Sequence, residues 1–195
     1  KVDQVKALCE KWFGPIESRE LKKRDLPQEG PQQAAKEMTV RAEVPYAAVY
    51  KMFHVPAHTE RGYYVADIIT DLLSNGKSAL LFQSLVKDKK VSPQVNAYSW
   101  GLHHPGVVSI DGRVAEGVSL KTYEDALAES LEKIQELTEE DLNRIKGTLE
   151  ASFVMQQTRI LSKTMTLAIS DSLGDVDLIN TTPKIYQGIQ LDEVK

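Results

Sequence analysis

The sequence predicts an α+β fold, in which helices pack on a largely antiparallel sheet. The chain has 195 residues, of which 42% are hydrophobic, and a chain of this size can bury the core of one domain. Segments with the two-residue alternation of strands come in pairs, and segments with helical periodicity separate the pairs. Because this order reads α-β-β-α-α-β-β-α-α, we expect one α+β domain over residues 1–195.

The first 35 residues are expected to form a helix and a long polar loop. The helix ends at Gly14-Pro15 and carries an apolar stripe, in which Cys9 is expected to be a small buried side chain. We expect Trp12 and Phe13 to hold this helix against the sheet. Residues 17–35 contain Pro and Gly among polar side chains and are predicted to be an internal loop. The stripe consists of Val2, Val5, Leu8, Trp12 and Phe13.

Two strands are expected before the next helix. Over residues 37–44, apolar side chains alternate with polar ones, which is typical of a half-buried strand. Pro45 ends this strand, and residues 46–53 are predicted to form a second strand in the middle of the sheet. The alternating apolar side chains are Met38, Val40, Ala42 and Val44.

The middle of the chain is expected to hold two helices and two strands. One helix starts at Thr59 and ends at Gly76, and a short helix capped by Ser78 continues through Val86. Residues 91–100 are predicted to form a strand, in which Pro93 cannot donate to a ladder and so marks an edge or a bulge. A turn at 103–106 then leads into a strand over 107–115.

Two strong helices are expected after the second pair of strands. Thr122 with Asp125 resembles a capping box, and Thr138 with Asp141 forms a second one. We expect the second helix to run without a break toward Gly174 and to be most buried beyond Ile160, where it is apolar nearly all round. The remainder is predicted to be a loop, followed by the start of a helix at Leu191.

Charge and composition exclude several classes of partner. The net charge is −4, and the basic residues form no stripe, so we expect no binding to nucleic acid. No apolar run approaches the ~20 residues of a membrane span. A single cysteine permits no internal disulfide and leaves a bacterial periplasmic or a cytoplasmic location open. Because Lys1 stands inside a helical pattern, we expect the chain to be a fragment of a longer one.

No catalytic constellation is predicted for this chain. His54 and His58 have the spacing of a zinc-binding pair on a helix, but Pro56 disfavours a helix there and Ala57 stands where a glutamate is required. His103 and His104 are predicted to lie in an exposed turn. We therefore expect no metal site, no cofactor and no catalytic residue within these 195 residues.

Five short motifs resemble the second, non-catalytic domain of a half-molecule in the pitrilysin/insulinase family of zinc metallopeptidases, which includes the mitochondrial processing peptidase. The family pattern has an arginine where this chain has Ala79, so any ion pair of that arginine is absent here. The motifs are Trp12-Phe13-Gly14-Pro15-Ile16, the loop from Pro27 to Gln33, His54-Val55-Pro56, Ser78-Ala79-Leu80 with Leu85-Val86-Lys87, and Thr138-Glu139-Glu140-Asp141-Leu142 with Lys146.

The resemblance implies a division of labour between domains. Zinc belongs to a partner domain, in the same or a neighbouring chain, and this domain helps to enclose a peptide substrate. The complementary half of such enzymes often supplies an Arg and a Tyr near the scissile bond, but those positions fall here at Val86 and Pro93. The chain therefore resembles the second domain of the zinc-bearing half, or a degenerate copy.

In some relatives a strand edge of the second domain holds the substrate's N-terminus by β-augmentation. Here the corresponding residues are Asn96, Ala97, Tyr98, Ser99 and Trp100. The alternative that we favour is that this strand is simply paired, with Trp100 in the core.

Two other functions remain open at this stage. The chain could be a purely architectural subunit of a processing-peptidase-like complex, or an unrelated α+β binding module. We also expect a fragment with an open sheet edge to self-associate through that edge.

Overall fold

The computed structural model describes residues 1–20, 27, 30, 32–101 and 103–195. The chain divides into two compact units, Lys1–Ala42 and Glu43–Lys195, and each is described by itself. None of the described helices combines the length and the apolar character needed to cross a bilayer.

The first unit contains a single described helix, α1 (Val2–Phe13), which buries none of its residues. Cys9 is exposed, so the expectation of a buried thiol is wrong. The role expected for Trp12 and Phe13 joins the two units and stays a prediction.

Residues 37–44 form no strand, and Met38 and Val40 are exposed. The strand predicted there is wrong, because alternation buries a face only when another strand pairs with it.

The second unit is built on a three-stranded antiparallel sheet. Its strands are β1 (Ala48–Val55), β2 (Val95–Trp100) and β3 (Gly106–Arg113). The order across the sheet is β1-β3-β2, so β3 lies in the middle. β1, expected to be central, is therefore an edge strand among the strands described for this unit.

One face of the sheet carries the first hydrophobic core. Val95 and Ala97 of β2 and Val108 and Ile110 of β3 point into it. They pack against α3 (Leu120–Glu132), where Tyr123 and Leu127 are buried, and against a π-helical segment, η1 (Phe82–Asp88).

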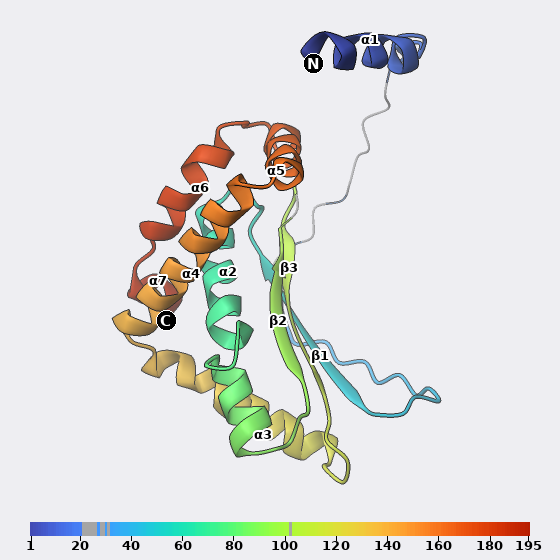
Figure 1. The fold of residues 1–195 in the computed structure, drawn as a ribbon. Coiled ribbons are helices and arrows are strands. Elements are labelled where there is room, and N and C mark those ends of the chain that lie inside the picture. The colour runs from blue at the N-terminus through green and yellow to red at the C-terminus, as the bar shows by residue number, and fades with distance from the viewer. Residues whose placement is uncertain (21–26, 28–29, 31, 102) are drawn as a thin grey trace. The chain divides into compact units, whose positions relative to one another are not determined.

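A second core lies on the far side of helix α2 (Arg61–Ser74), which stands beside the sheet (Figure 1). Tyr64, Ile68 and Leu72 follow one another at a spacing of four residues and are almost completely buried. They pack against α4 (Glu139–Gln157), α6 (Leu178–Gln187) and α7 (Leu191–Val194). Burying each of these side chains contributes ~1.5–3 kcal/mol, so α2 holds the sheet and the outer helices together.

Side-chain caps define where α3 and α4 begin. Thr138 and Asp141 form the predicted capping box at the start of α4, with reciprocal backbone and side-chain hydrogen bonds. Helix α3 begins earlier than predicted, because Ser119 accepts a hydrogen bond from the Thr122 backbone N–H and acts as the N-cap.

The C-terminal helices differ from the prediction. The long helix is broken at Thr158 and Arg159, and α5 (Ile160–Ser172) follows as a separate helix. Its side chains at Ile160 and Leu161 are 85% and 75% exposed, so the second half is not the most buried part of this segment. The loop predicted before Leu191 is wrong in part, because α6 forms there with Pro183 inside it.

Candidate functional site

The residues predicted to bind substrate, 96–100, all lie in β2. This strand pairs with β3 along one side, from Val95↔Gly112 to Trp100↔Val107. Among the strands described in Glu43–Lys195, none pairs with its other side. The predicted strand therefore runs along an edge of the sheet, as Pro93 indicated.

Backbone groups of β2 are directed away from β3 at alternate residues. The Arg113 N–H donates to the Gln94 carbonyl at 3.1 Å, so this pair is hydrogen-bonded across the two strands. Alternation along an antiparallel ladder then turns the N–H and C=O groups of Val95, Ala97 and Ser99 toward the open edge. The Ala97 carbonyl accepts a hydrogen bond from the Ser74 hydroxyl at 2.7 Å, so α2 already occupies one position on this edge.

The sheet face opposite the first core is rich in exposed aromatic and apolar side chains. We call Tyr50, Met52, Tyr98 and Trp100 the outer apolar face, and their exposed fractions run from 38% to 66%. The rings of Tyr98 and Trp100 lie 6.2 Å apart. Trp100 is 59% exposed, so the expectation that it lies in the core is wrong. It points away from the helices because it alternates with the inward-facing Ser99.

Asp67 connects three elements behind β2. Its carboxylate accepts hydrogen bonds from the Ser99 hydroxyl of β2 and from the Tyr186 hydroxyl of α6, the latter at 2.6 Å. Burial, reinforced by the nearby charge of Asp67, raises the pKa of Tyr186, so this hydroxyl stays protonated and donates. Asp67 thus fixes the edge strand to α2 and α6. Sequence reasoning missed it, because its partners lie 32 and 119 residues away along the chain.

The end of β2 packs closely against two rings. A Cβ on Gly101 would lie 2.5 Å from the His58 ring and 2.6 Å from the Tyr63 ring, so only glycine fits without a shift. The two ring centroids are 4.4 Å apart. Burial lowers the pKa of His58 in spite of the opposing charge of Asp67, so its imidazole is neutral near pH 7.

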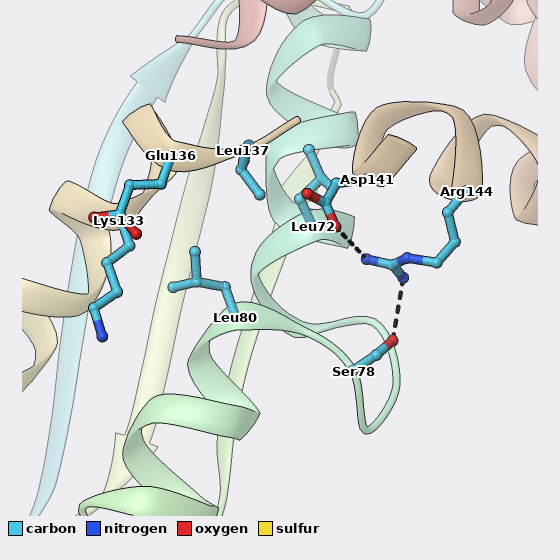
Figure 2. Close-up of a pocket in the computed structure, with 8 residues that line it drawn as sticks. All are labelled: Leu72, Ser78, Leu80, Lys133, Glu136, Leu137, Asp141 and Arg144. Carbon is cyan, nitrogen blue, oxygen red and sulfur yellow. Dashed lines mark hydrogen bonds and ion pairs between the residues drawn. The ribbon is translucent and has the colours of Figure 1, made fainter. Parts of the chain in front are cut away.

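A shallow hollow of about 230 Å³ lies where α2 ends and α4 begins. Figure 2 shows Arg144 between Ser78 and Asp141, with nitrogen–oxygen distances of 3.2 Å and 3.6 Å. Two of the motifs that carry the family resemblance, at Ser78 and at Thr138–Leu142, therefore meet here. The opposite charges of Arg144 and Asp141 neutralise each other, so neither residue offers a free charge to a ligand in this hollow. Their contacts instead join the helices around it.

Over the described residues, no three His, Cys, Asp or Glu side chains gather as metal ligands. The ring centroids of His103 and His104 lie 5.4 Å apart, in the turn before β3. Zinc-peptidase sites of the kind the resemblance implies use two His and a Glu around one ion. The described residues supply no such set.

The fold and the edge site define a class: an α+β domain in which helices cover an antiparallel sheet. The sequence matches the family model of the peptidase M16 inactive domain over residues 1–149. The chain belongs to this family, and the domain is not itself catalytic. The predicted pitrilysin/insulinase-type, non-catalytic domain is thereby confirmed. No curated protein matches the sequence.

Solved structures share the fold at low sequence identity. A protease from Helicobacter pylori is 18% identical with a TM-score of 0.90, and the match covers 100% of this chain and 48% of that one. The inactive peptidase domain of a candidate zinc protease from Bordetella parapertussis is 20% identical with a TM-score of 0.70, over 80% of this chain and 83% of the other. The periplasmic protease PqqL from Escherichia coli is 13% identical with a TM-score of 0.70, and this chain covers 22% of it. The chain thus spans about half of the first protein and a smaller part of the last.

Proposed function

We propose that this domain forms part of the wall of a chamber that encloses peptide substrates, and that it supports a zinc-bearing domain of the same or a neighbouring chain. Membership of the M16 inactive-domain family supports this role. The observation that carries it is the open edge of β2, which offers backbone groups at Val95, Ala97 and Ser99.

An extended peptide would add to the sheet as a fourth strand beside β2. Its main chain would hydrogen-bond to the edge groups, as in other cases of β-augmentation. The side chains of Asn96, Tyr98 and Trp100 lie on the side of the sheet that carries the outer apolar face. There they would contact every second side chain of the peptide. The Ala97 carbonyl would first have to be released by Ser74.

Hydrolysis itself is assigned to the partner domain. There a zinc ion would polarise the scissile carbonyl and activate water. In this chain the residues hold and orient the peptide, and none of them exchanges a proton with it.

The test is a titration of the ¹⁵N-labelled chain with an extended peptide, followed by NMR. Shifts concentrated at Val95–Trp100 support the proposal. The matched control is the same peptide methylated on alternate backbone nitrogens, which removes the N–H donors and should not bind. Equal binding of both peptides, or shifts elsewhere only, would contradict β-augmentation.

An architectural role without peptide binding is the second candidate. The match to a chain of complex III from Candida albicans, with a TM-score of 0.67 and 15% identity, shows that such an assembly contains this fold. Failure of the peptide titration, together with stable binding to a zinc-bearing partner domain, would favour this role.

A further inference from the structure

A cavity of about 350 Å³ lies among the helices of Glu43–Lys195, behind the layer that carries the edge strand. Faces of α4, α5 and α6 form its walls, and Asp67 of α2 and His58 also line it. Its volume falls in the range of small-ligand pockets, ~300–1,000 Å³. We refer to it as the helical cavity.

The helical cavity is rich in hydrogen-bond acceptors. The Asp67 carboxylate accepts from Ser99 and Tyr186, but two carboxylate oxygens offer about four acceptor positions, so capacity remains. Glu150 is exposed, and its carboxylate accepts a hydrogen bond of 3.3 Å from the Gln187 side chain.

The helical hydrogen bonding of α6 lacks one donor beside the cavity. Pro183 lies inside α6 and has no N–H, so the Ile179 carbonyl loses its usual donor four residues on. Both residues line the cavity.

The one lysine in the lining is already engaged. The Lys146 ammonium donates to the carbonyls of Gln187 at 3.0 Å and Ile189 at 2.6 Å, and the residue is only 8% exposed. The carboxylates of Asp67 and Glu150 carry two negative charges and the Lys146 ammonium one positive charge, so the net charge of these three groups is −1. Two further titratable groups line the cavity: burial lowers the pKa of His58, which is therefore neutral near pH 7, and burial raises the pKa of Tyr186, which stays protonated.

Apolar side chains form the rest of the lining. Leu149 and Phe153 come from α4, Ile169 comes from α5, and Leu173 directly follows α5. A ligand that fits must therefore be apolar along its length and cationic at its end. The face of Phe153 adds a favourable surface for a cation.

We propose that the helical cavity binds an amine or guanidinium cation on an apolar stem, namely the side chain of a lysine or arginine in a peptide. The peptide as its source rests on the proposed function. The cavity and its charge do not depend on that function.

The experiment uses the full chain with ¹³C-labelled Leu and Ile methyl groups and n-hexylamine as the probe. Hexylamine should shift the methyl signals of Leu149, Ile169 and Leu173 in a saturable manner, whereas 1-hexanol should bind at least fivefold more weakly and hexanoate not at all. Glu150→Gln should weaken hexylamine at least fivefold. The matched control, Glu139→Gln, changes an exposed glutamate of the same helix outside the cavity and should leave binding unchanged.

Two outcomes overturn the site. One is equal binding of hexylamine and hexanol, and the other is equal weakening by Glu139→Gln and Glu150→Gln. A peptide with one lysine should also bind more tightly than the same peptide with norleucine, and equal affinity overturns the peptide side chain as the ligand. If a peptide shifts β2 amides while hexylamine shifts no cavity methyl, the cavity proposal fails and the proposed function stands.

Discussion

Replacing Lys146 with methionine tests the link between α4 and the C-terminal helices. The ammonium donates to two carbonyls at the end of α6, Gln187 and Ile189, at 3.0 and 2.6 Å. Methionine keeps much of the stem but leaves both carbonyls without this donor, in a place where the lysine is 8% exposed.

The expected loss follows from the two hydrogen bonds and one compensating gain. Hydrogen bonds to charged groups contribute ~1.5–3 kcal/mol each. Part of this is recovered, because the ammonium no longer has to be desolvated. We therefore expect Lys146→Met to lower the free energy of unfolding by about 2–4 kcal/mol.

Urea unfolding followed by tryptophan fluorescence measures this loss. The chain has two tryptophans, and a Trp12→Phe background leaves Trp100 of β2 as the reporter for the second unit. The control is Lys163→Met, an exposed position on α5. Amide exchange at 189–194 should also accelerate in Lys146→Met. A midpoint equal to that of Lys163→Met, with unchanged exchange, would refute the reasoning.

Substitutions at the end of β2, at the ion pair between α2 and α7, and on the outer apolar face give three further expected outcomes. Gly101→Ala should destabilise by ~1–3 kcal/mol through overpacking against His58, and an unchanged melting temperature would contradict it. Arg61 holds the pKa of Glu193 at about 2, against 4.5 ordinarily. The stability from this pair is full above pH 4.5 and lost toward pH 2, so Glu193→Gln should flatten the urea midpoint over that interval, and an unaltered pH profile counts against it. Self-association through the open edge should make the molar mass from light scattering rise with concentration, whereas Trp100→Lys should keep the mass at that of a monomer. A mass of the unsubstituted chain that does not depend on concentration argues against self-association.

The sequence predicted the elements that have strong local signals. The capping box of Thr138 and Asp141 marks the start of α4, as expected, and Pro93 correctly indicated an edge beside the candidate site. The strand predicted over residues 91–100 is present, but it is shorter than predicted and begins at Val95.

Tertiary context decided the rest. The break at Thr158 and Arg159 contains neither Gly nor Pro, so no local signal announces it. A proline inside a helix removes one backbone hydrogen bond, yet α6 forms around Pro183. The contacts of Asp67 with Ser99 and Tyr186 become visible only after the chain has folded, because no sequence period connects them.

The strand order β1-β3-β2 determines when each strand can join the sheet during folding. β2 and β3 form a hairpin whose nearest pair, Trp100↔Val107, is 7 residues apart, whereas the nearest β1–β3 pair, Val55↔Gly106, is 51 apart. Each doubling of loop length costs ~0.6 kcal/mol of chain entropy, so closing the longer loop costs roughly 2 kcal/mol more. The β2–β3 hairpin therefore forms early. β1 docks later, after α2 and η1, which lie between β1 and β2 in the sequence, have packed together. Until then, the central strand is itself an edge, and a second nascent chain can pair with β3 on the side that belongs to β1.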